Sequence, residues 1–448
     1  MRSRNLIILA VVAVALGAFI FFVERHQPTT DEAVERADRV FPELDEEAIE
    51  TVEIESSHGP IRLSLVEDEW RMVEPLDWAA DPTAVRSLLG AISNLDTERT
   101  LSLGEVALSD YGLDDPVLGV VLVDANGVRF ALAVGDATPL GSKRAVRRGT
   151  DDEIILSADA FVAALDREID EWRSRDVIDL LEHDLESIEI STVEDRIRVE
   201  QINGRWQLIE PLVDLADRDQ LQSLISELNT LRVGEFLSGD GDPSELGLDP
   251  PAFRVVLKPK GVETTTTLEL SASEEGAGTV VCRRDGVDLF QVSDSIATRL
   301  SKAPVLWRSD KVWSFSTWDA AKIELTGSAG EVVLDRVDGL WQFDDGGEAD
   351  SAEVRRRLNA LADLEVREHD LILPPTQVMG SVIVVLEDDQ SAEGLTYTFF
   401  APIEEGGHAA VTVSARANVM GVDAVTAETI LGDLEKLQPI VGGGPAGE

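Results

Sequence analysis

The chain has few residues suited to metal binding or nucleophilic chemistry, and they are scattered. The histidines are His26, His58, His183, His369 and His408, and the single cysteine is Cys282. No His-x-x-x-His pair or mixed cysteine and histidine spacing occurs, so the sequence gives no sign of a structural zinc site. Cys282 follows Val280 and Val281 in an apolar run, which predicts a buried strand position, whereas a reactive thiol would need an activating base nearby. An intramolecular disulfide is excluded because there is no second cysteine.

Acidic and glycine-rich segments suggest two other kinds of site. The runs Asp240 to Asp242 and Asp344 to Glu348 offer calcium ligands, but neither has the spacing of a twelve-residue calcium loop, so we expect solvated loops. The run Gly135 to Gly141, with Lys143 close behind, loosely resembles a phosphate-binding loop. Its glycines are one residue too far apart and no helix pattern follows at once, so we expect a loop between strands.

Enzymatic activity finds no support in these patterns. Paired carboxylates cannot be singled out among 86 acidic residues, and no Gly-x-Ser-x-Gly nucleophile elbow is present. We therefore predict no catalytic residue, no cofactor and no metal. The sequence favours a non-catalytic protein and leaves the question of enzymatic activity open.

The charge of the chain restricts its partners. With 86 acidic and 39 basic residues, the net charge is −47. Such a surface repels nucleic acid and anionic lipid headgroups, so no nucleic acid is expected as a partner. We expect partners that are neutral, basic or bound through cations. Acidity with little lysine fits either a saline habitat or a GC-rich genome, and the sequence does not distinguish these origins.

The N-terminal region predicts attachment to a membrane. Leu6 to Val23 is an uncharged stretch of 18 residues, just long enough to cross a bilayer core as a helix. Arg2 and Arg4 precede it, so the positive-inside bias predicts a cytoplasmic N-terminus and an extracytoplasmic bulk. A cleaved signal peptide is the alternative, but no small-x-small cleavage site follows Val23. We expect a stub over 1–5, a single anchor over 6–23, a linker over 24–37, and location in a bacterial inner membrane.

A sequence unit of about 135 residues is repeated in tandem after this segment and occurs three times. Trp70, Trp206 and Trp341 occupy equivalent places, 136 and 135 residues apart. Repetition at a fixed period predicts a tandem architecture, so we expect three α+β units with their own cores, or units that share sheets end to end. The expected units are 38–175, 176–310 and 311–437, the last divergent, followed by a flexible tail over 438–448.

Each unit is expected to be an antiparallel sheet with two amphipathic helices. The first strands are the alternating runs 52–55, 188–191 and 323–326. The first helices begin after Asp81, Asp217 and Asp350, which are natural N-cap residues. Apolar residues at helical spacing, from Val85 to Leu95 in the first unit, predict that one face of this helix packs on the sheet. The second helix is expected over 158–170 in the first unit.

Other recurring residues are expected to be scaffold rather than site. They are Pro75 and Pro211 after the first two tryptophans, the turn residues Gly112, Pro116, Gly247 and Pro250, and the unit-ending Trp172 and Trp307. The glycines are expected to adopt positive φ, and the prolines to end turns or strands. Trp70, Trp206 and Trp341 could form a ligand platform, but their recurrence in every unit favours a place between strand and helix.

These features together resemble a bacterial family named domain of unknown function 4340. The resemblance rests on the anchor, the Trp-x-x-x-x-Pro strand, the Ala-Asp helix start and the Tyr-Gly-Leu-Asp-x-Pro turn. It covers nearly the whole exported part and is weakest in the third unit, which lacks the proline after Trp341 and the Gly-Leu-Asp turn. Members of this family are often encoded beside a gliding-type ABC transporter, so the resemblance implies an accessory role at such a transporter. It brings no catalytic residues.

Three hypotheses of function follow. The first is a single-pass, extracytoplasmic repeat protein that acts as a non-catalytic scaffold of an ABC-type transport system, with the bilayer and a permease or auxiliary membrane protein as partners. The second is an envelope glycan-binding protein or hydrolase with a site between repeat units. The third is a structural or adhesive element. A non-repeated polar cluster in one deep pocket would favour the second hypothesis.

Overall fold

The computed structural model describes residues 36–438, apart from 117, 140–141, 238–240, 329, 372–376, 388–393 and 403–405. The predicted anchor, Leu6 to Val23, and almost all of the linker and tail lie outside the described residues. Within the described part of the chain, no helix combines the length and apolar character needed to cross a bilayer.

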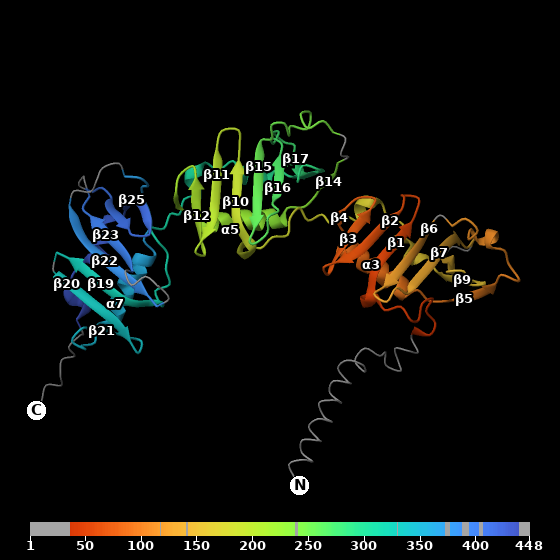
Figure 1. Ribbon diagram of the computed structural model, residues 1–448, viewed down its shortest axis with the longest axis horizontal. Helices are drawn as coiled ribbons and strands as arrows, with labels where there is room; N and C mark the ends of the chain where they lie inside the picture. The colour runs from red at the N-terminus through yellow and green to blue at the C-terminus, as the bar shows by residue number, and fades with distance from the viewer. Residues whose placement is uncertain are drawn as a thin grey trace, which may run out of the picture. The chain divides into compact units, whose positions relative to one another are not determined.

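The chain divides into two compact units, Met1–Arg175 and Asp176–Glu448 (Figure 1). The first unit contains the first repeat. The second unit contains both the second and the third repeats, which share contacts described below. Each repeat builds a separate antiparallel sheet, so the described sheets do not run from one repeat into the next.

The first repeat forms a nine-stranded sheet of order β4-β3-β2-β1-β6-β7-β8-β9-β5. Its strands are β1 (Ile49–Glu55), β2 (Ile61–Val66), β3 (Glu69–Glu74), β4 (Trp78–Ala79), β5 (Arg99–Ser102), β6 (Leu118–Asp124), β7 (Arg129–Ala137), β8 (Lys143–Arg148) and β9 (Glu153–Ala158). In β1 the apolar Val52 and Ile54 are buried while Glu53 faces outward, as the alternating pattern predicts.

The second repeat has the same order of nine strands, β13-β12-β11-β10-β15-β16-β17-β18-β14. They are β10 (Leu185–Ser191), β11 (Arg196–Ile202), β12 (Arg205–Glu210), β13 (Asp214–Leu215), β14 (Glu235–Phe236), β15 (Phe253–Pro259), β16 (Thr266–Leu270), β17 (Thr279–Arg284) and β18 (Asp288–Ser293). The repetition in sequence is therefore a repetition of topology.

The third repeat keeps the central strands and has a seven-stranded sheet of order β21-β20-β19-β22-β23-β24-β25. The strands are β19 (Ala320–Gly327), β20 (Gly330–Val337), β21 (Leu340–Phe343), β22 (Val378–Leu386), β23 (Leu395–Phe400), β24 (Ala409–Val413) and β25 (Arg416–Val422). Its sheet differs from the others at the edges, which agrees with its divergent sequence.

One long helix covers a face of each sheet. The helices are α3 (Pro82–Ser93), α5 (Arg218–Thr230) and α7 (Ser351–Ala362). The carboxylates of Asp81, Asp217 and Asp350 accept hydrogen bonds from amides of the first turn, which confirms the three predicted N-caps. The predicted apolar stripe is buried in all three helices.

The second helix of each repeat is shorter than expected. The prediction of a helix over 158–170 is wrong, because only α4 (Val162–Leu165) is α-helical there, between 3-10 turns at Asp159–Phe161 and Ile169–Glu171. Phe161, Leu165 and Trp172 all pack in the core of the repeat, and this packing outweighs the helical period. The counterparts of α4 in the other repeats, α6 (Ser295–Leu300) and α8 (Ala424–Leu431), are also short. The fold is α+β, but richer in sheet than predicted.

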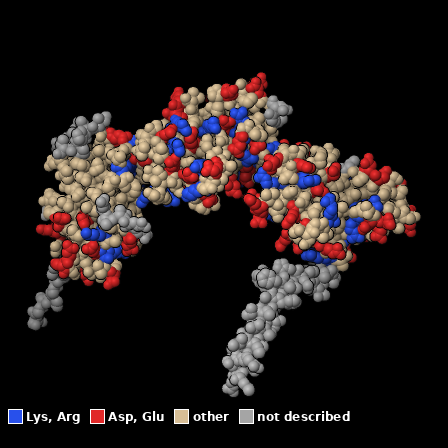
Figure 2. Space-filling model, in the orientation of Figure 1, with Lys and Arg blue, Asp and Glu red and all other residues tan. Residues whose placement is uncertain are grey.

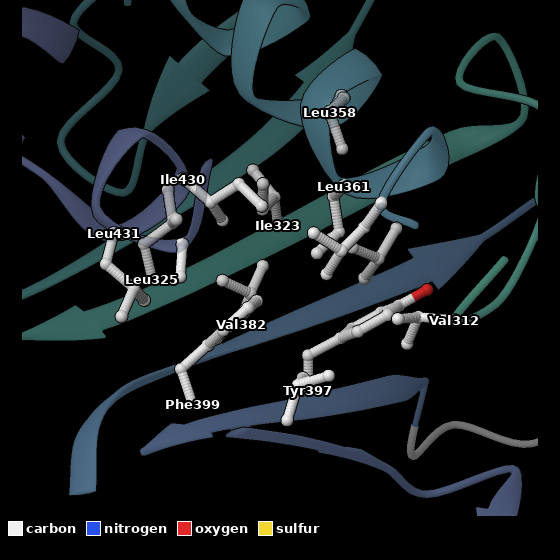
Figure 3. Close-up of a cluster of buried hydrophobic side chains, with 14 of the residues drawn as sticks. Val312, Ile323, Leu325, Leu358, Leu361, Val382, Tyr397, Phe399, Ile430 and Leu431 are labelled. Atoms are coloured by element: carbon white, nitrogen blue, oxygen red, sulfur yellow. The ribbon is translucent and has the colours of Figure 1, made fainter. Parts of the chain in front are cut away.

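The core of the third repeat lies between its sheet and helices α7 and α8 (Figure 3). Ile323 and Leu325 of β19 and Val382 of β22 point towards Leu358 and Leu361 of α7 and towards Ile430 and Leu431 of α8. Burial raises the pKa of the Tyr397 phenol, which lies in the same cluster. The phenol is therefore neutral and contributes to packing.

Candidate functional site

The signature tryptophans lie on the second hairpin of each repeat. Trp70 pairs with Leu65, Trp206 with Gln201 and Trp341 with Arg336 across equivalent strands. Trp206 and Trp341 are buried, and Trp70 is half-buried against the core. Their common position favours the scaffold interpretation.

The other signature residues also define backbone geometry. Gly112 and Gly247 have φ of 64° and 69°, as expected, and Pro116 and Pro250 follow them. Pro75 and Pro211 follow cis peptide bonds at the ends of β3 and β12. Trp172 and Trp307 are fully buried, and their carbonyls accept hydrogen bonds from the amides of Asp81 and Asp217. These residues are distributed over the repeats and do not meet in one site.

A cluster of buried charges, absent from the sequence predictions, lies between the second and third repeats. Its centre is Asp214 of β13, whose side chain is fully buried. Trp78 occupies the equivalent position in the first repeat, because both residues pair with the same point of the preceding strand. Asp214 is therefore a feature of one junction, not of the repeat.

Two buried arginines bind Asp214 from different repeats. Arg308, which follows Trp307, donates from Nε to Asp214 Oδ2 at 2.6 Å. Arg416 of β25 donates from Nη2 to the same oxygen at 3.0 Å and from Nε to Oδ1. Arg416 also donates from Nη1 to the carbonyl of Lys311 at 2.7 Å. A single carboxylate thus joins strands that lie far apart in the sequence.

A second carboxylate balances the cluster. Asp370 accepts from Nη2 of Arg308 at 3.0 Å and from the amide nitrogen of Asn418 at 2.9 Å. We call Asp214, Arg308, Asp370 and Arg416 the junction network. Two carboxylates and two guanidiniums give it no net charge, which is the condition under which buried charges are tolerated.

The junction network shifts the protonation of its members. Burial acts to raise the pKa of Asp214, but hydrogen bonds from Arg416 and Arg308 outweigh it and bring the pKa below its usual value. A hydrogen bond from Arg308 likewise lowers the pKa of Asp370. Burial, together with the two arginines, lowers the pKa of the neighbouring His369. The two carboxylates are ionised and His369 is neutral near pH 7.

A polar groove of about 840 Å³ opens beside this network. We call it the junction groove. From the second repeat it is lined by Glu182, His183, Gln201, Asn203, Gly204, Arg205, Trp206, Leu215, Ala216, Asp217, Arg218 and Asp219, and from the following segment by Ser309, Asp310, Lys311, Ser314, Phe315 and Ser316. Charged groups of both signs therefore face the same space.

Direct contacts hold the walls of the junction groove. Glu182 accepts from Nε1 of Trp206 at 3.2 Å and from Nε of Arg218 at 3.4 Å. The guanidinium of Arg205 lies 4.5 Å from the ring centre of Trp313 and donates to the carbonyl of Ser314 at 2.8 Å. Burial lowers the pKa of Arg205. The second and third repeats are thus joined by aromatic and polar contacts as well as by the junction network.

The described residues bear on the metal, thiol and phosphate sites considered from the sequence. No group of three or more metal-ligating side chains is found among them. Burial raises the pKa of Cys282 to about 12, so this thiol is protonated and enclosed, as its sequence predicts. Gly135 belongs to strand β7 and not to a phosphate-binding loop. The junction groove offers hydrogen-bonding and charged groups for a polar ligand or a protein segment.

Sequence reasoning missed the junction network. The triplet Trp-Arg-Ser at 172–174 and 307–309 marked Arg308 as recurrent, but gave no partner for it. The available signal was the replacement of Trp78 by Asp214 at one repeated position. Arg416 had no signal, because its contact with Asp214 joins residues 202 positions apart.

A family sequence profile, described as Domain of unknown function (DUF4340), matches the chain twice, at residues 70–208 and 206–369. The chain belongs to the DUF4340 family. Each DUF4340 match begins at a signature tryptophan, and the second includes Asp214 and Arg308 but ends before Asp370 and Arg416. No curated protein and no solved structure matches this DUF4340 chain.

Proposed function

We propose that this DUF4340 protein is a membrane-anchored, extracytoplasmic scaffold that binds proteins of an ABC-type transport system. The observation that carries the proposal is a charged patch that recurs in every repeat on the sheet face opposite the long helix, which we call the open face. Glu53, Glu189 and Glu324 hold the same position in the first strands β1, β10 and β19. Repeated surfaces of this kind serve extended protein contacts.

Each of these glutamates is held by a basic neighbour. Glu53 lies 2.8 Å from Arg129, and Glu189 lies 2.7 Å from Arg196. Glu324 lies 2.6 Å from Lys322.

The second repeat extends this pattern across its sheet. Arg283 of β17 lies 2.7 Å from Glu269 of β16. Figure 2 shows acidic and basic side chains interspersed over the strands of this repeat. Fixed charges on the face of a sheet favour orientation and specificity towards a protein partner, whereas small ligands prefer concave sites.

The transporter enters the proposal through the family. The resemblance to DUF4340 implies gene neighbours that encode an ABC permease and its ATPase. The uncharged stretch from Leu6 to Val23 gives such a protein a way to lie beside a permease. The repeats then present their sheet faces on the extracytoplasmic side.

A pull-down from native membranes tests this proposal. Tagged full-length protein is solubilised in mild detergent and its partners are identified by mass spectrometry. We expect the permease and ATPase to co-purify, and recovery to fall when Leu6 to Val23 is replaced by an unrelated anchor. Glu189→Arg on the open face should reduce recovery, whereas Glu274→Arg in an exposed loop should not. Recovery of the protein alone would sink the transporter proposal.

The junction groove supports a second candidate, the binding of envelope glycans. It is a polar groove lined from two repeats, which agrees with the hypothesis of a glycan site between repeat units. Calorimetric titration with soluble peptidoglycan fragments should show saturable binding that is weakened in Arg218→Ala. Absence of heat with wild-type protein would remove this candidate.

A further inference from the structure

The third repeat has an exposed aromatic groove at the edge of its sheet. Trp318, just before β19, is 71% exposed. The guanidinium of Arg355 lies 6.0 Å from the centre of its ring, and Arg336 donates a hydrogen bond to its carbonyl. A groove of about 170 Å³ lies between these side chains, with Trp341 and Leu358 in its wall. We call it the Trp318 groove.

The Trp318 groove stands at the same place in the fold as one wall of the junction groove. Arg336 pairs with Trp341 across the hairpin, as Gln201 pairs with Trp206 in the second repeat. Trp318 precedes its first strand at the position that His183 holds in the second repeat. The two grooves are therefore versions of one repeated feature beside the signature tryptophan.

In the second repeat, an extended segment of protein covers this place. The amide of Asp217 donates to the carbonyl of Trp307 at 2.8 Å. Further along the same segment, the carbonyl of Ser314 accepts a hydrogen bond from Arg205 at 2.8 Å. The segment Trp307 to Ser316 thus runs beside the signature tryptophan and completes the junction groove. This position of the fold accommodates an extended chain.

In the third repeat the start of the same path is present. The amide of Asp350 donates to the carbonyl of Leu437 at 2.9 Å, which takes the role of Trp307. The described part of the chain ends at Gln438.

The charge of the Trp318 groove differs from that of its counterpart. Arg336 replaces Gln201, and Arg355, five residues after its helix N-cap, replaces Gln222. Among the ion pairs of the described residues, neither Arg336 nor Arg355 has a carboxylate partner, although the chain carries a net charge of −47. Two guanidiniums beside an exposed indole fit a carboxylate next to an apolar side chain.

We propose that the Trp318 groove binds an extended, acidic segment of a partner protein. The segment lies where residues 307–316 lie in the second repeat, with a carboxylate at Arg336 and Arg355 and an apolar side chain on Trp318. The inference rests on the proposed protein-binding function and adds to it the docking place and the chemistry of the partner.

Fluorescence polarisation with two labelled peptides tests the inference on the full-length protein in detergent. The acidic probe, Ser-Asp-Glu-Val-Trp-Ser-Phe-Ser, copies residues 309–316 with glutamate in place of Lys311. The neutral probe, Ser-Asn-Gln-Val-Trp-Ser-Phe-Ser, removes both carboxylates. Each exposed ion pair increases binding affinity by a few-fold. We therefore expect the acidic probe to bind about tenfold more tightly than the neutral one.

Variants assign that preference to the groove. The double variant Arg336→Gln/Arg355→Gln should abolish the preference, and Trp318→Ala should weaken both probes. Arg86→Gln, on the exposed side of helix α3 in the first repeat, makes a matched charge change elsewhere and should leave binding unchanged. Unaltered melting of each variant shows that its fold is retained.

Any one of four results would overturn the proposal. Equal binding of the probes to wild-type protein, or a preference that survives in the double variant, shows that the arginines do not select a carboxylate. Acidic-probe binding that occurs only after deletion of residues 439–448 shows that the chain's own tail is the occupant. If the membrane pull-down still recovers partners equally with the double variant, the groove inference fails while the scaffold proposal stands.

Discussion

Asp214 is the residue whose loss should affect the second compact unit most. It is the carboxylate that two buried arginines share, so Asp214→Asn leaves Arg308 and Arg416 without half of their compensation. We expect the free energy of unfolding of this unit to fall by about 3–5 kcal/mol. Urea denaturation measures it. The control Asp363→Asn breaks an exposed ion pair with Lys311 and should change stability by less than about 1 kcal/mol.

The same residues give the junction an acid limit. Folded Asp214 and Asp370 have pKa values below their ordinary values, so their contribution is fully present above the unfolded pKa of roughly 3.9. That contribution is lost as the pH falls through the folded pKa values. The melting temperature of the second unit should therefore decline steeply below about pH 4. Asp214→Asn should flatten the decline, and equal slopes would contradict the assignment.

At the scale of single residues, only part of the structure was predictable from the sequence. The N-cap aspartates and the positive-φ glycines follow from local backbone chemistry, so Asp81 and Gly112 were predictable. The junction network depends on contacts between distant residues, and no local pattern reports them. The only indication in the sequence was that Asp214 stands at the repeated position where the first repeat has Trp78.

Helix α7 shows how one element of the third repeat departs from its counterparts. Arg357 occupies the position of Leu88 in α3 and Leu224 in α5, and it is only 1% exposed. Its guanidinium donates to the carbonyls of Ile430, Gly432 and Asp433, at 3.1, 2.8 and 2.7 Å. The helix therefore binds the end of α8 through backbone carbonyls.

Arg357→Leu tests this role of α7. Leucine restores the apolar stripe of the other repeats but leaves buried carbonyls without donors, so we expect a loss of about 1–3 kcal/mol. Hydrogen exchange should rise mainly between Ala424 and Gln438. The control Arg355→Leu, on the exposed side of α7, should leave that protection unchanged. Protection that rises in Arg357→Leu would contradict the interpretation.

Strand β7 explains why the first repeat needs glycine at position 135. A Cβ there would lie 2.1 Å from the carbonyl oxygen of Tyr111, which precedes Gly112. Gly135→Ala should destabilise the first unit by about 1–3 kcal/mol, because backbone has to move. Gly119→Ala, whose added Cβ would meet Leu132 oxygen at 3.5 Å, should cost much less. Thermal melting of the two variants gives the comparison, and similar losses would rule out the contact as the cause.

The compact units set the expected behaviour of the whole molecule. The second and third repeats share the junction network, so a fragment over 176–438 should unfold in one cooperative transition. A fragment over 311–438 lacks Asp214 and Arg308 and leaves Arg416 without its carboxylate, so it should be much less stable. Circular dichroism during heating compares them. A stable 311–438 fragment with a sharp transition would show that the network is dispensable.

The architecture was more accessible to sequence reasoning than its details. Trp70, Trp206 and Trp341 fixed the period, and the alternating strands fixed the antiparallel class. The short second helices were missed because packing of Phe161 and Trp172 outweighs a helical pattern. The edges of the third sheet were missed because Trp341 lacks the motif that follows its counterparts.

The hydrogen bonds from Asp81 to Trp172 and from Asp217 to Trp307 also order events in time. Each helix start is completed by a carbonyl that is synthesised about 90 residues later, near the end of the same repeat. A chain that leaves the ribosome, or a translocation channel, N-terminus first cannot close the first repeat until Trp172 has emerged. The contact between helix start and final tryptophan is therefore incomplete in each of these two repeats during synthesis. It forms only when the last residues of the repeat have been made.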